Sequence, residues 1–271
     1  MALQTGLGNR LLAALLPADL DLLQPHFRKM SFGADAVLVR TGDELKQVYF
    51  LLSGVLAFLV EMSDGHIVAS ILMGSEGAVG ALSILSPSQS PVIVTAYAAG
   101  IALQVPALRL QLAFEQSAAI RRVLRLHFRT QLLQLQNMAA CNAVHPVECR
   151  MARWLLEIHD RVANGEIQLT QEALAQLLGV RRTTVTVTMR KLREIGGIIS
   201  ERRGVLEVHR TRLEKVACEC YDVVRQRIKR MHDEELAMGS PKMSHLQYSP
   251  FLLIPMISPG CTDLISPRIP R

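Results

Sequence analysis

Aromatic residues and long apolar runs are scarce in this sequence. Phe, Tyr and Trp make up only 4% of the 271 residues, whereas hydrophobic residues make up 49%, so the cores must be largely aliphatic. No apolar run approaches the roughly 20 residues that cross a bilayer, and no basic-then-apolar leader opens the chain. We therefore expect a cytoplasmic protein without a membrane partner. A chain of this length holds one large or two ordinary domains.

Cysteine is also scarce. The chain has five cysteines, all in its second half. This odd number lacks the density of a disulfide scaffold, so we expect free thiols and a reducing compartment. The lone C-x-C formed by Cys218 and Cys220 offers too few ligands for a metal cluster. We interpret these two residues as structural thiols on the last helix.

The histidines do not have the spacing of a metal site. No two of the eight share the H-x-H or H-x-x-x-H spacing that metal sites favour. His127 falls on a long predicted helix. A haem or redox ligand is one interpretation of this residue, and a surface or interface histidine is the one we favour. The sequence therefore predicts no metal and no other cofactor.

What the chain does have is a local surplus of positive charge. The net charge is +6. Residues 143–232 hold seventeen Lys and Arg against eleven Asp and Glu, whereas residues 1–142 hold ten against nine. An acidic partner is therefore expected to bind the second half of the chain.

The first half is typical of short strands separated by glycine turns. The segment Val48–Met73 contains two turn signals, Ser53-Gly54 and Asp64-Gly65, and Val92–Pro106 indicates a hairpin around Gly100. Asp-Gly between apolar runs is a strong hairpin signal, because glycine tolerates the positive φ that such turns need. Short strands at this spacing predict a double-sheet barrel or jelly roll.

From Ser117 to Ala140, apolar residues recur three or four apart, which predicts a helix roughly 36 Å long. A single apolar stripe on so long a helix needs something to cover it. The cover is either the helix's own domain or the same helix of a second chain across a two-fold axis, and we predict the second, a homodimer. The stripe consists of Ile120, Leu124, Phe128, Leu132, Leu135 and Met138.

Two shorter helices are expected next, over His145–Val162 and Ile167–Val180. Pro146 suits the first turn of the former, and Trp154, the only tryptophan, is expected to anchor a small core. Thr170 is the expected N-cap of the latter.

The stretch GVRRTTVTVTMRKLRE, residues 179–194, alternates Thr and Val in its middle, which taken alone predicts a strand. A strand would leave Leu192 and Ile195 without a buried role, so we predict a helix instead. Its buried side would carry Thr184, Val185, Thr188, Leu192 and Ile195. Its outer side would carry Arg182, Thr183, Thr186, Val187 and Arg190. A short helix that ends at a glycine before such a helix is a helix-turn-helix layout. The alternative is a solvated basic helix without a partner.

The segment Gly196–Arg210 indicates a hairpin with Arg202-Arg203-Gly204 at its tip. Beside a basic helix, such a hairpin is a wing that can touch phosphates, and the alternative is an ordinary solvated turn. A final helix is expected over Thr211–Met231. From Gly239 on, six of the chain's 12 prolines and an aperiodic sequence predict a poorly ordered tail.

In their order along residues 12–231, these features resemble the cyclic-AMP receptor (Crp/Fnr) family of bacterial transcription regulators. The resemblance rests on a roll with glycine turns, a long helix, and a winged helix-turn-helix containing LTQEALAQLLGVRRTTV. It implies an α+β fold with a double-stranded β-helix (jelly-roll) sensor domain in residues 1–116. A dimerisation helix in 117–142, a winged helix-turn-helix DNA-binding domain in 143–232 and a disordered tail in 233–271 would follow.

The resemblance also implies partners and contact residues. Family members bind a palindromic operator in double-stranded DNA as dimers and act on RNA polymerase, and their second motif helix enters the major groove. The residues expected to contact DNA are Thr170, Gln171, Arg181, Arg182, Thr183, Thr186, Val187, Arg190, Arg202 and Arg203. Arg182 occupies a position near the helix start where family members place an arginine against a guanine edge. Arg203 is expected to contact phosphate only.

The sensor part departs from the family's cyclic-nucleotide site, in which Gly is followed by Glu and a later Arg-Ser pair meets the cyclic phosphate. Here Ala81 follows Gly80, and Ser90-Pro91 replaces Arg-Ser, so that with Ser83 these residues make a degenerate pocket. A cyclic phosphate needs a cation or several donors, so we expect cyclic-AMP binding to be lost, with the effector unassigned. Oxygen-sensing members bind an iron–sulfur cluster through N-terminal cysteines. No cysteine precedes Cys141, which excludes that cluster in its known place.

Two other functions fit parts of the pattern. A β-roll also suits a cupin-type metalloenzyme, but that class needs clustered His and Glu ligands on its strands, and only His66 lies on a predicted strand. A ligand-binding adaptor of the same fold without DNA binding is the second alternative, and the intact basic face argues against it. The sequence thus favours a DNA-binding regulator that is not an enzyme.

Overall fold

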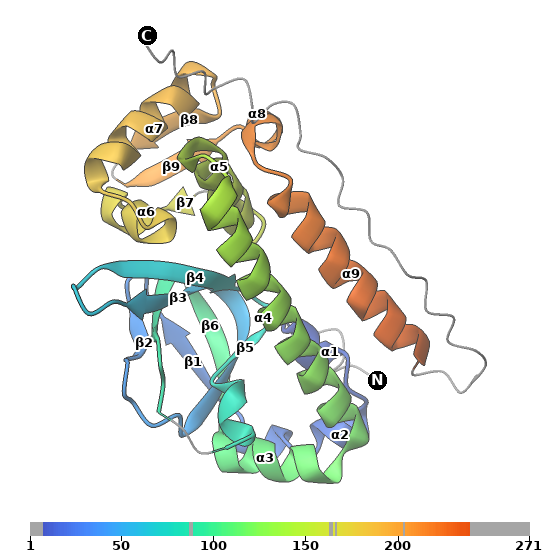
Figure 1. Ribbon diagram of the computed structural model, residues 1–271. Coiled ribbons are helices and arrows are strands. Elements are labelled where there is room, and N and C mark those ends of the chain that lie inside the picture. Colours follow the sequence, from blue (N-terminus) through green and yellow to red (C-terminus); the bar gives the residue numbers. More distant parts are fainter. Residues whose placement is uncertain (1–7, 87–88, 163–164, 166, 203, 239–271) are drawn as a thin grey trace.

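The computed structural model describes residues 8–238, apart from residues 87–88, 163–164, 166 and 203. Figure 1 shows an antiparallel sheet at one end of the molecule and a winged-helix part at the other. The long helix α4 runs past the sheet toward the winged-helix part, and α9 lies beside it. This is the α+β architecture that the sequence predicts.

The N-terminal part is a six-stranded sheet with short flanking helices. Its central strands, β3 (Gln47–Glu61) and β6 (Ile93–Pro106), pair along most of their length. The strand order is β1-β6-β3-β4, with β2 also paired to β6 and β5 to β3. The remaining elements are α1 (Arg10–Ala13), α2 (Pro17–Leu20), η1 (Gln24–His26), β1 (Arg28–Phe32), β2 (Val37–Val39), β4 (Ile67–Met73), β5 (Ala78–Val79) and η2 (Ala81–Ile84).

Two of the three predicted turns in this sheet are wrong. Asp64-Gly65 does form the turn between β3 and β4, and Gly65 has a φ of 84°. Ser53-Gly54 and Gly100 instead lie inside β3 and β6, and the pairing of these two strands shifts in register at this point. A Cβ on Gly100 would lie 2.2 Å from the carbonyl oxygen of Ser53. These glycines therefore allow a close backbone approach at a bulge rather than a chain reversal.

The helical segment that follows the sheet consists of α3 (Ala107–Gln116) and α4 (Ala118–Val144). Ser117 separates them. Its backbone is extended, and its hydroxyl accepts a hydrogen bond from the backbone N–H of Ile120 at 3.0 Å, which makes it the N-cap of α4. Among the described residues, no helix has both the length and the apolar character needed to cross a bilayer.

The C-terminal part has the predicted helix-turn-helix and wing. The motif consists of α6 (Gln171–Leu178) and α7 (Arg182–Glu194), and a three-stranded sheet of order β7-β9-β8 supports it. The other elements are α5 (Val147–His159), β7 (Ile167–Gln168), β8 (Ile198–Arg202), β9 (Val205–Val208), α8 (Arg210–Val216) and α9 (Cys220–Met238).

The single helix predicted over Thr211–Met231 is wrong. The chain leaves α8 at Ala217, whose ψ is 144°, and becomes helical again at Cys220. Cys218 therefore lies in the break and not on a helix. The helix α9 reaches Met238, inside the segment predicted to be disordered, and residues 239–271 lie outside the described part of the chain.

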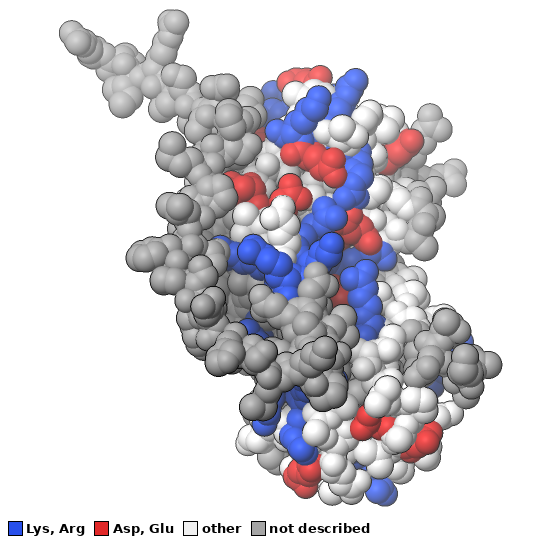
Figure 2. Space-filling model, turned by 90° about the vertical axis from the view of Figure 1, so that its right-hand side faces the viewer, with Lys and Arg blue, Asp and Glu red and all other residues white. Residues whose placement is uncertain are grey.

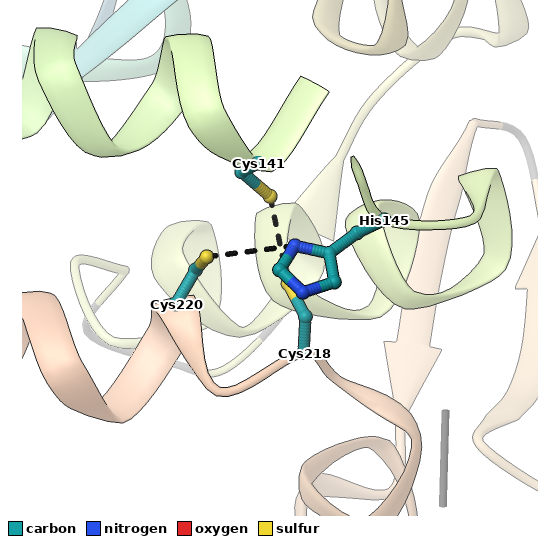
Figure 3. Close-up of side chains that lie close together, drawn as sticks. All are labelled: Cys141, His145, Cys218 and Cys220. Carbon is teal, nitrogen blue, oxygen red and sulfur yellow. Dashed lines mark hydrogen bonds between the residues drawn. The ribbon is translucent and has the colours of Figure 1, made fainter. Parts of the chain in front are cut away.

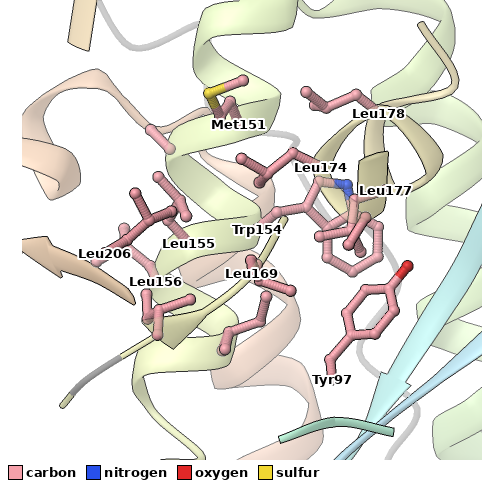
Figure 4. Packing of buried hydrophobic residues seen from close by; sticks show 14 of the residues in the cluster. Tyr97, Met151, Trp154, Leu155, Leu156, Leu169, Leu174, Leu177, Leu178 and Leu206 are labelled. Carbon is pink, nitrogen blue, oxygen red and sulfur yellow. The ribbon is translucent and has the colours of Figure 1, made fainter. Parts of the chain in front are cut away.

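One hydrophobic core joins the sheet to the winged-helix part. Trp154 of α5 is 0% exposed and belongs to the same buried cluster as Tyr97 of β6 and Leu174 and Leu177 of α6 (Figure 4). The hydroxyl of Tyr97 also donates a hydrogen bond to Oε1 of Gln176 at 3.4 Å. The small core expected around Trp154 is therefore a larger one that spans both parts.

A half-buried ion pair supports the same contact. Nε of Arg161, just after α5, lies 2.7 Å from Oε1 of Glu76, between β4 and β5. Burial alone would raise the pKa of Glu76, but the attraction of Arg161 and the hydrogen bonds to this carboxylate together hold the pKa below its usual range. Because separating the two parts would break this pair, it adds to the contact between them.

Candidate functional site

The turn of the helix-turn-helix is fixed by local chemistry. Thr170 is the N-cap of α6, and its hydroxyl accepts a hydrogen bond from the N–H of Ala173 at 3.1 Å. Gly179 ends α6 in the left-handed region, with a φ of 62°. Arg181 then precedes α7 with an extended backbone. The sequence-predicted motif is therefore confirmed, including its cap and its glycine.

The inner side of α7 packs as predicted except at its end. Val185, Thr188 and Leu192 are buried together with Met189, whereas Ile195 is 41% exposed, so its predicted burial is wrong. The Thr188 hydroxyl donates to the carbonyl oxygen of Thr184 at 2.8 Å. This bond back to the preceding turn satisfies the buried hydroxyl, and packing of the inner side overrides the β preference of the Thr and Val residues.

The outer side of α7 faces solvent. All five residues predicted there are exposed. Nε of Arg182 lies 3.6 Å from Oε2 of Glu172, and both side chains are mainly exposed, so this ion pair holds the guanidinium only weakly. The hydroxyl of Thr186 donates a hydrogen bond to Oε1 of Gln171 at 3.3 Å. This bond links Gln171, a predicted DNA-contact residue on α6, to the outer side of α7.

The wing lies next to α7. Arg202 ends β8, and Arg203 lies outside the described residues. Arg193 on α7 forms an ion pair with Glu201 on β8, and Lys191 forms one with Glu148 on α5. These two cations orient α7 within the domain, whereas the cations of its outer side have weaker partners. The structure thus brings the predicted contact residues of α6, α7 and β8 together in one winged helix-turn-helix.

The hydroxyl groups of the predicted effector pocket form hydrogen bonds with nearby backbone carbonyl groups. The Ser83 hydroxyl donates to the carbonyl oxygen of Gly80 at 2.7 Å, and the Ser90 hydroxyl donates to that of Val92 at 2.7 Å. Ala81 is buried in an apolar cluster beside η2.

A cavity of about 880 Å³ lies elsewhere, between α4, α9 and the sheet, and it falls within the size range of small-molecule sites. His127 and Thr130 of α4 and Tyr221 and Arg225 of α9 are among its lining residues, whereas none of the four predicted effector residues is. His127 is 3% exposed, and its Nε2 lies 3.1 Å from the carbonyl oxygen of Ala78. The surface or interface position predicted for this histidine is therefore wrong, because the sheet of the same chain covers that side of α4.

The apolar stripe of α4 does not form one surface. Ile120 and Leu124 are buried in the cluster under α1 and α3, and Phe128 packs against that cluster. Met138 is buried in the core around Trp154. Only two residues of the stripe remain exposed, Leu132 at 56% and Leu135 at 42%. A partner chain could therefore contact the middle of the predicted stripe and not its ends.

Four side chains that the sequence analysis did not combine lie together at the end of α4 (Figure 3). Cys141 and His145 come from the last turn and C-cap of α4, Cys218 from the break after α8, and Cys220 from the start of α9. Their sulfur and ring nitrogen atoms all lie within 4.8 Å of one another. The sequence held two signals, the C-x-C motif of Cys218 and Cys220 and the C-x-x-x-H spacing of Cys141 and His145, which places these two on one side of a helix.

The thiols of this cluster interact with one another. Sγ of Cys141 lies 3.5 Å from Sγ of Cys218, and Sγ of Cys220 lies 3.6 Å from Nδ1 of His145. Hydrogen bonds from Cys218 and Cys220 lower the pKa of the Cys141 thiol. Cys141, Cys218 and Cys220 are free thiols, as the sequence predicts.

The face of the molecule that carries α9 has mixed charge. Figure 2 shows Lys and Arg side chains in a band down this face, interrupted by Asp and Glu. Arg225 on α9, for example, lies 3.7 Å from Asp222 in an ion pair. On α7, Arg190 likewise lies 3.7 Å from Glu194 in an exposed ion pair.

Two known protein families match this chain, one in each half. Residues 29–117 match the family of cyclic nucleotide-binding domains, and residues 149–216 match the family of Crp-like helix-turn-helix domains. A global nitrogen regulator from Nostoc sp. (strain PCC 7120) is 25% identical over 203 residues, which are 68% of this chain and 91% of that protein.

Solved structures show the same fold at lower identity. The c-di-GMP-responsive global regulator of Xanthomonas campestris aligns with a TM-score of 0.59 at 19% identity, over 71% of this chain and 98% of that one. A Crp/Fnr-family transcriptional regulator from Eubacterium rectale aligns with a TM-score of 0.63 at 18% identity, over 77% and 98%. With a cyclic nucleotide-binding-type domain followed by a helix-turn-helix DNA-binding domain, the chain belongs to the Crp/Fnr family of transcription regulators, which are not enzymes.

Proposed function

We propose that this regulator binds a palindromic operator as a homodimer and that its sensor domain has lost cyclic-AMP binding. The observation that carries the proposal is the exposed outer side of α7, which combines Arg182 and Arg190 with hydroxyl and methyl groups and lies in a capped helix-turn-helix. A two-fold dimer presents two such helices to half-sites about one helical turn apart. DNA as the partner implies a cytoplasmic location, and RNA polymerase is the further partner expected of such a regulator.

Base reading is assigned to the start of α7. The guanidinium of Arg182 is exposed and held only by a weak ion pair, so it is free to form a bidentate contact with a guanine edge, which contributes about 1–3 kcal/mol of discrimination. Thr183 and Val187 present methyl groups that suit a thymine methyl. An adaptor without DNA binding is the less favoured function, because it gives this outer side no role.

The loss of cyclic-AMP binding is supported by the partners of the predicted pocket residues. The Ser83 and Ser90 hydroxyls are already donated to backbone carbonyls, and Ala81 brings neither charge nor hydrogen-bonding capacity. A cyclic phosphate placed there would lose its hydration without gaining a cation. The cavity between α4, α9 and the sheet is a more suitable volume for an effector of other chemistry.

The substitution Arg182→Ala is expected to weaken binding to the preferred operator by about 1–3 kcal/mol and to relax the preference at one base position. The measurement is binding to a randomised site library at two salt concentrations. Arg109→Ala, which removes an exposed arginine on α3 far from the wing, is the matched control and should leave binding unchanged. An equal loss of affinity for every sequence would show that Arg182 contacts phosphate instead.

The double substitution Leu132→Glu and Leu135→Glu is expected to convert the dimer to monomers in sedimentation experiments, because it places charge on the exposed middle of the α4 stripe. Leu108→Glu, at an equally exposed leucine on α3, should leave the dimer intact. Charge at Leu124 is not a useful probe, since that side chain lies in the chain's own core. A double variant that stays dimeric would place the two-fold contact elsewhere.

Calorimetric titration of the protein with cyclic AMP is expected to give no binding heat, because Ala81 replaces the family's glutamate and Ser90 replaces the arginine that meets the cyclic phosphate. Dissociation constants in the micromolar range would contradict the assigned loss of this ligand.

A further inference from the structure

We propose that Cys141, His145, Cys218 and Cys220 bind one zinc-type divalent cation, and that this ion fastens α9 to the end of α4 at the junction with the DNA-binding domain. The two matched families and the regulatory function do not include this site. It rests on the side chains that α4, the break after α8, and α9 bring to one point (Figure 3).

The distances fit a single ion. In a tetrahedral zinc site with Zn–S bonds of about 2.3 Å, neighbouring ligand sulfurs lie about 3.8 Å apart. The Sγ atoms of Cys141 and Cys218 are 3.5 Å apart, and Sγ of Cys220 is 3.6 Å from Nδ1 of His145. All four ligand atoms lie within 4.8 Å of one another, which leaves room for one ion and not for an iron–sulfur cluster among them.

The ligand types indicate the metal. Three cysteines and one histidine form a set typical of closed structural zinc sites, and thiolates select soft or borderline cations over magnesium and calcium. Cys141 and Cys218 are buried, and Cys220 and His145 are half-buried, so few water molecules can compete for the ion. Cys141 and Cys220 also line the cavity between α4 and α9, which provides an entry path.

The histidine is already oriented as a ligand. Its Nε2 lies 3.2 Å from Oε1 of Glu219, while its Nδ1 faces the thiol of Cys220. Metal-bound histidines commonly donate their second ring nitrogen to a carboxylate, which fixes the tautomer and strengthens the ligand. Glu219 is therefore a positioning residue that acts through His145.

The surrounding charge suits a thiolate-rich site. Three thiolates and one divalent cation carry a single net negative charge, which a nearby cation can offset. Arg150 and Arg153 of α5 lie close enough to Cys141 and Cys218 for their charges to interact with a thiolate at either position. The Nε–H groups of these two arginines are buried and have no hydrogen-bond partner within the described residues, so both retain a free donor beside the cluster.

The position of the site gives it a mechanical role. Cys141 and His145 lie immediately before α5, where the long helix passes into the DNA-binding domain, and Cys218 and Cys220 lie where the chain leaves that domain and returns along α4 as α9. An ion at this point joins the exit of the DNA-binding domain to its entrance. Loss of the ion should release α9 while leaving the sheet intact.

The test begins with the full-length protein purified under reducing conditions. We expect one zinc per chain by elemental mass spectrometry, and the zinc-stripped protein should take up one Co²⁺ with the thiolate-to-metal and ligand-field absorption bands of a tetrahedral site. Removal of the metal should increase hydrogen exchange in residues 141–147 and in α9, with exchange in β3 and β6 unchanged.

Variants separate ligands from neighbours. Cys141→Ser and Cys218→Ser should each abolish tetrahedral Co²⁺ binding, whereas Cys149→Ala, in the same buried cysteine cluster but outside the ligand set, should retain it. Glu219→Gln should keep one ion per chain with roughly 10–100-fold weaker affinity, as expected for a residue that acts through a ligand. Circular dichroism identical to that of the unmodified chain would show that each variant is folded.

Several results would overturn the proposal. They are protein that takes up no metal after reduction, Co²⁺ bound with an octahedral spectrum, bound iron with inorganic sulfide, or Cys141→Ser protein that binds Co²⁺ as well as the original. A disulfide between Cys141 and Cys218 that persists in place of metal binding would assign the cluster to redox chemistry instead. Unchanged hydrogen exchange in α9 after metal removal would refute the fastening role.

Discussion

Burial of Trp154 between α5, α6 and the sheet is the contact on which the arrangement of this regulator depends. Because the indole is fully buried together with Tyr97 of β6 and Leu177 of α6, the core of the DNA-binding domain continues into the sheet. Fully burying one large apolar side chain stabilises a fold by about 1.5–3 kcal/mol, so separating the domains would expose several such contributions at once. The Glu76–Arg161 pair adds an electrostatic cost to the same separation.

The long helix α4 packs against both the sheet and the shared core. The first half of α4 covers the sheet through Ile120 and Leu124, and Met138 near its end enters the core around Trp154. Only the segment around Leu132 and Leu135 stays exposed on the predicted stripe. A change in the sensor sheet can therefore reach the DNA-binding domain by two packed routes, directly through the core and along α4.

Local signals in the sequence were sufficient for the helix-turn-helix. The Thr170 cap and the left-handed Gly179 follow from local propensities. The two sides of α7 follow from the spacing of its apolar residues against the β preference of its Thr and Val residues, and the structure confirms them apart from Ile195 at the exposed end. Ser53-Gly54 and Gly100 were misread as turns because glycine also permits close backbone approach, and one sequence does not distinguish these uses. The α4 stripe was assigned to a partner because periodicity shows that a side is covered and not what covers it.

The cysteine cluster was missed for a different reason. The contact between Cys141 and Cys218 joins residues 77 positions apart and depends on a helix break that no glycine or proline marks. Short-range spacing rules cannot detect ligands that meet only after the chain has passed through a complete domain. The same long-range packing determines whether sensor and DNA-binding domains act as one unit.

Differential scanning calorimetry of the full-length protein tests most directly whether the two domains unfold as one unit. If the core around Trp154 joins the two domains, unfolding should be one transition whose calorimetric and van't Hoff enthalpies agree. Trp154 fluorescence and far-ultraviolet circular dichroism should then follow the same curve. Two separate transitions, with the tryptophan signal changing in only one of them, would contradict the shared core.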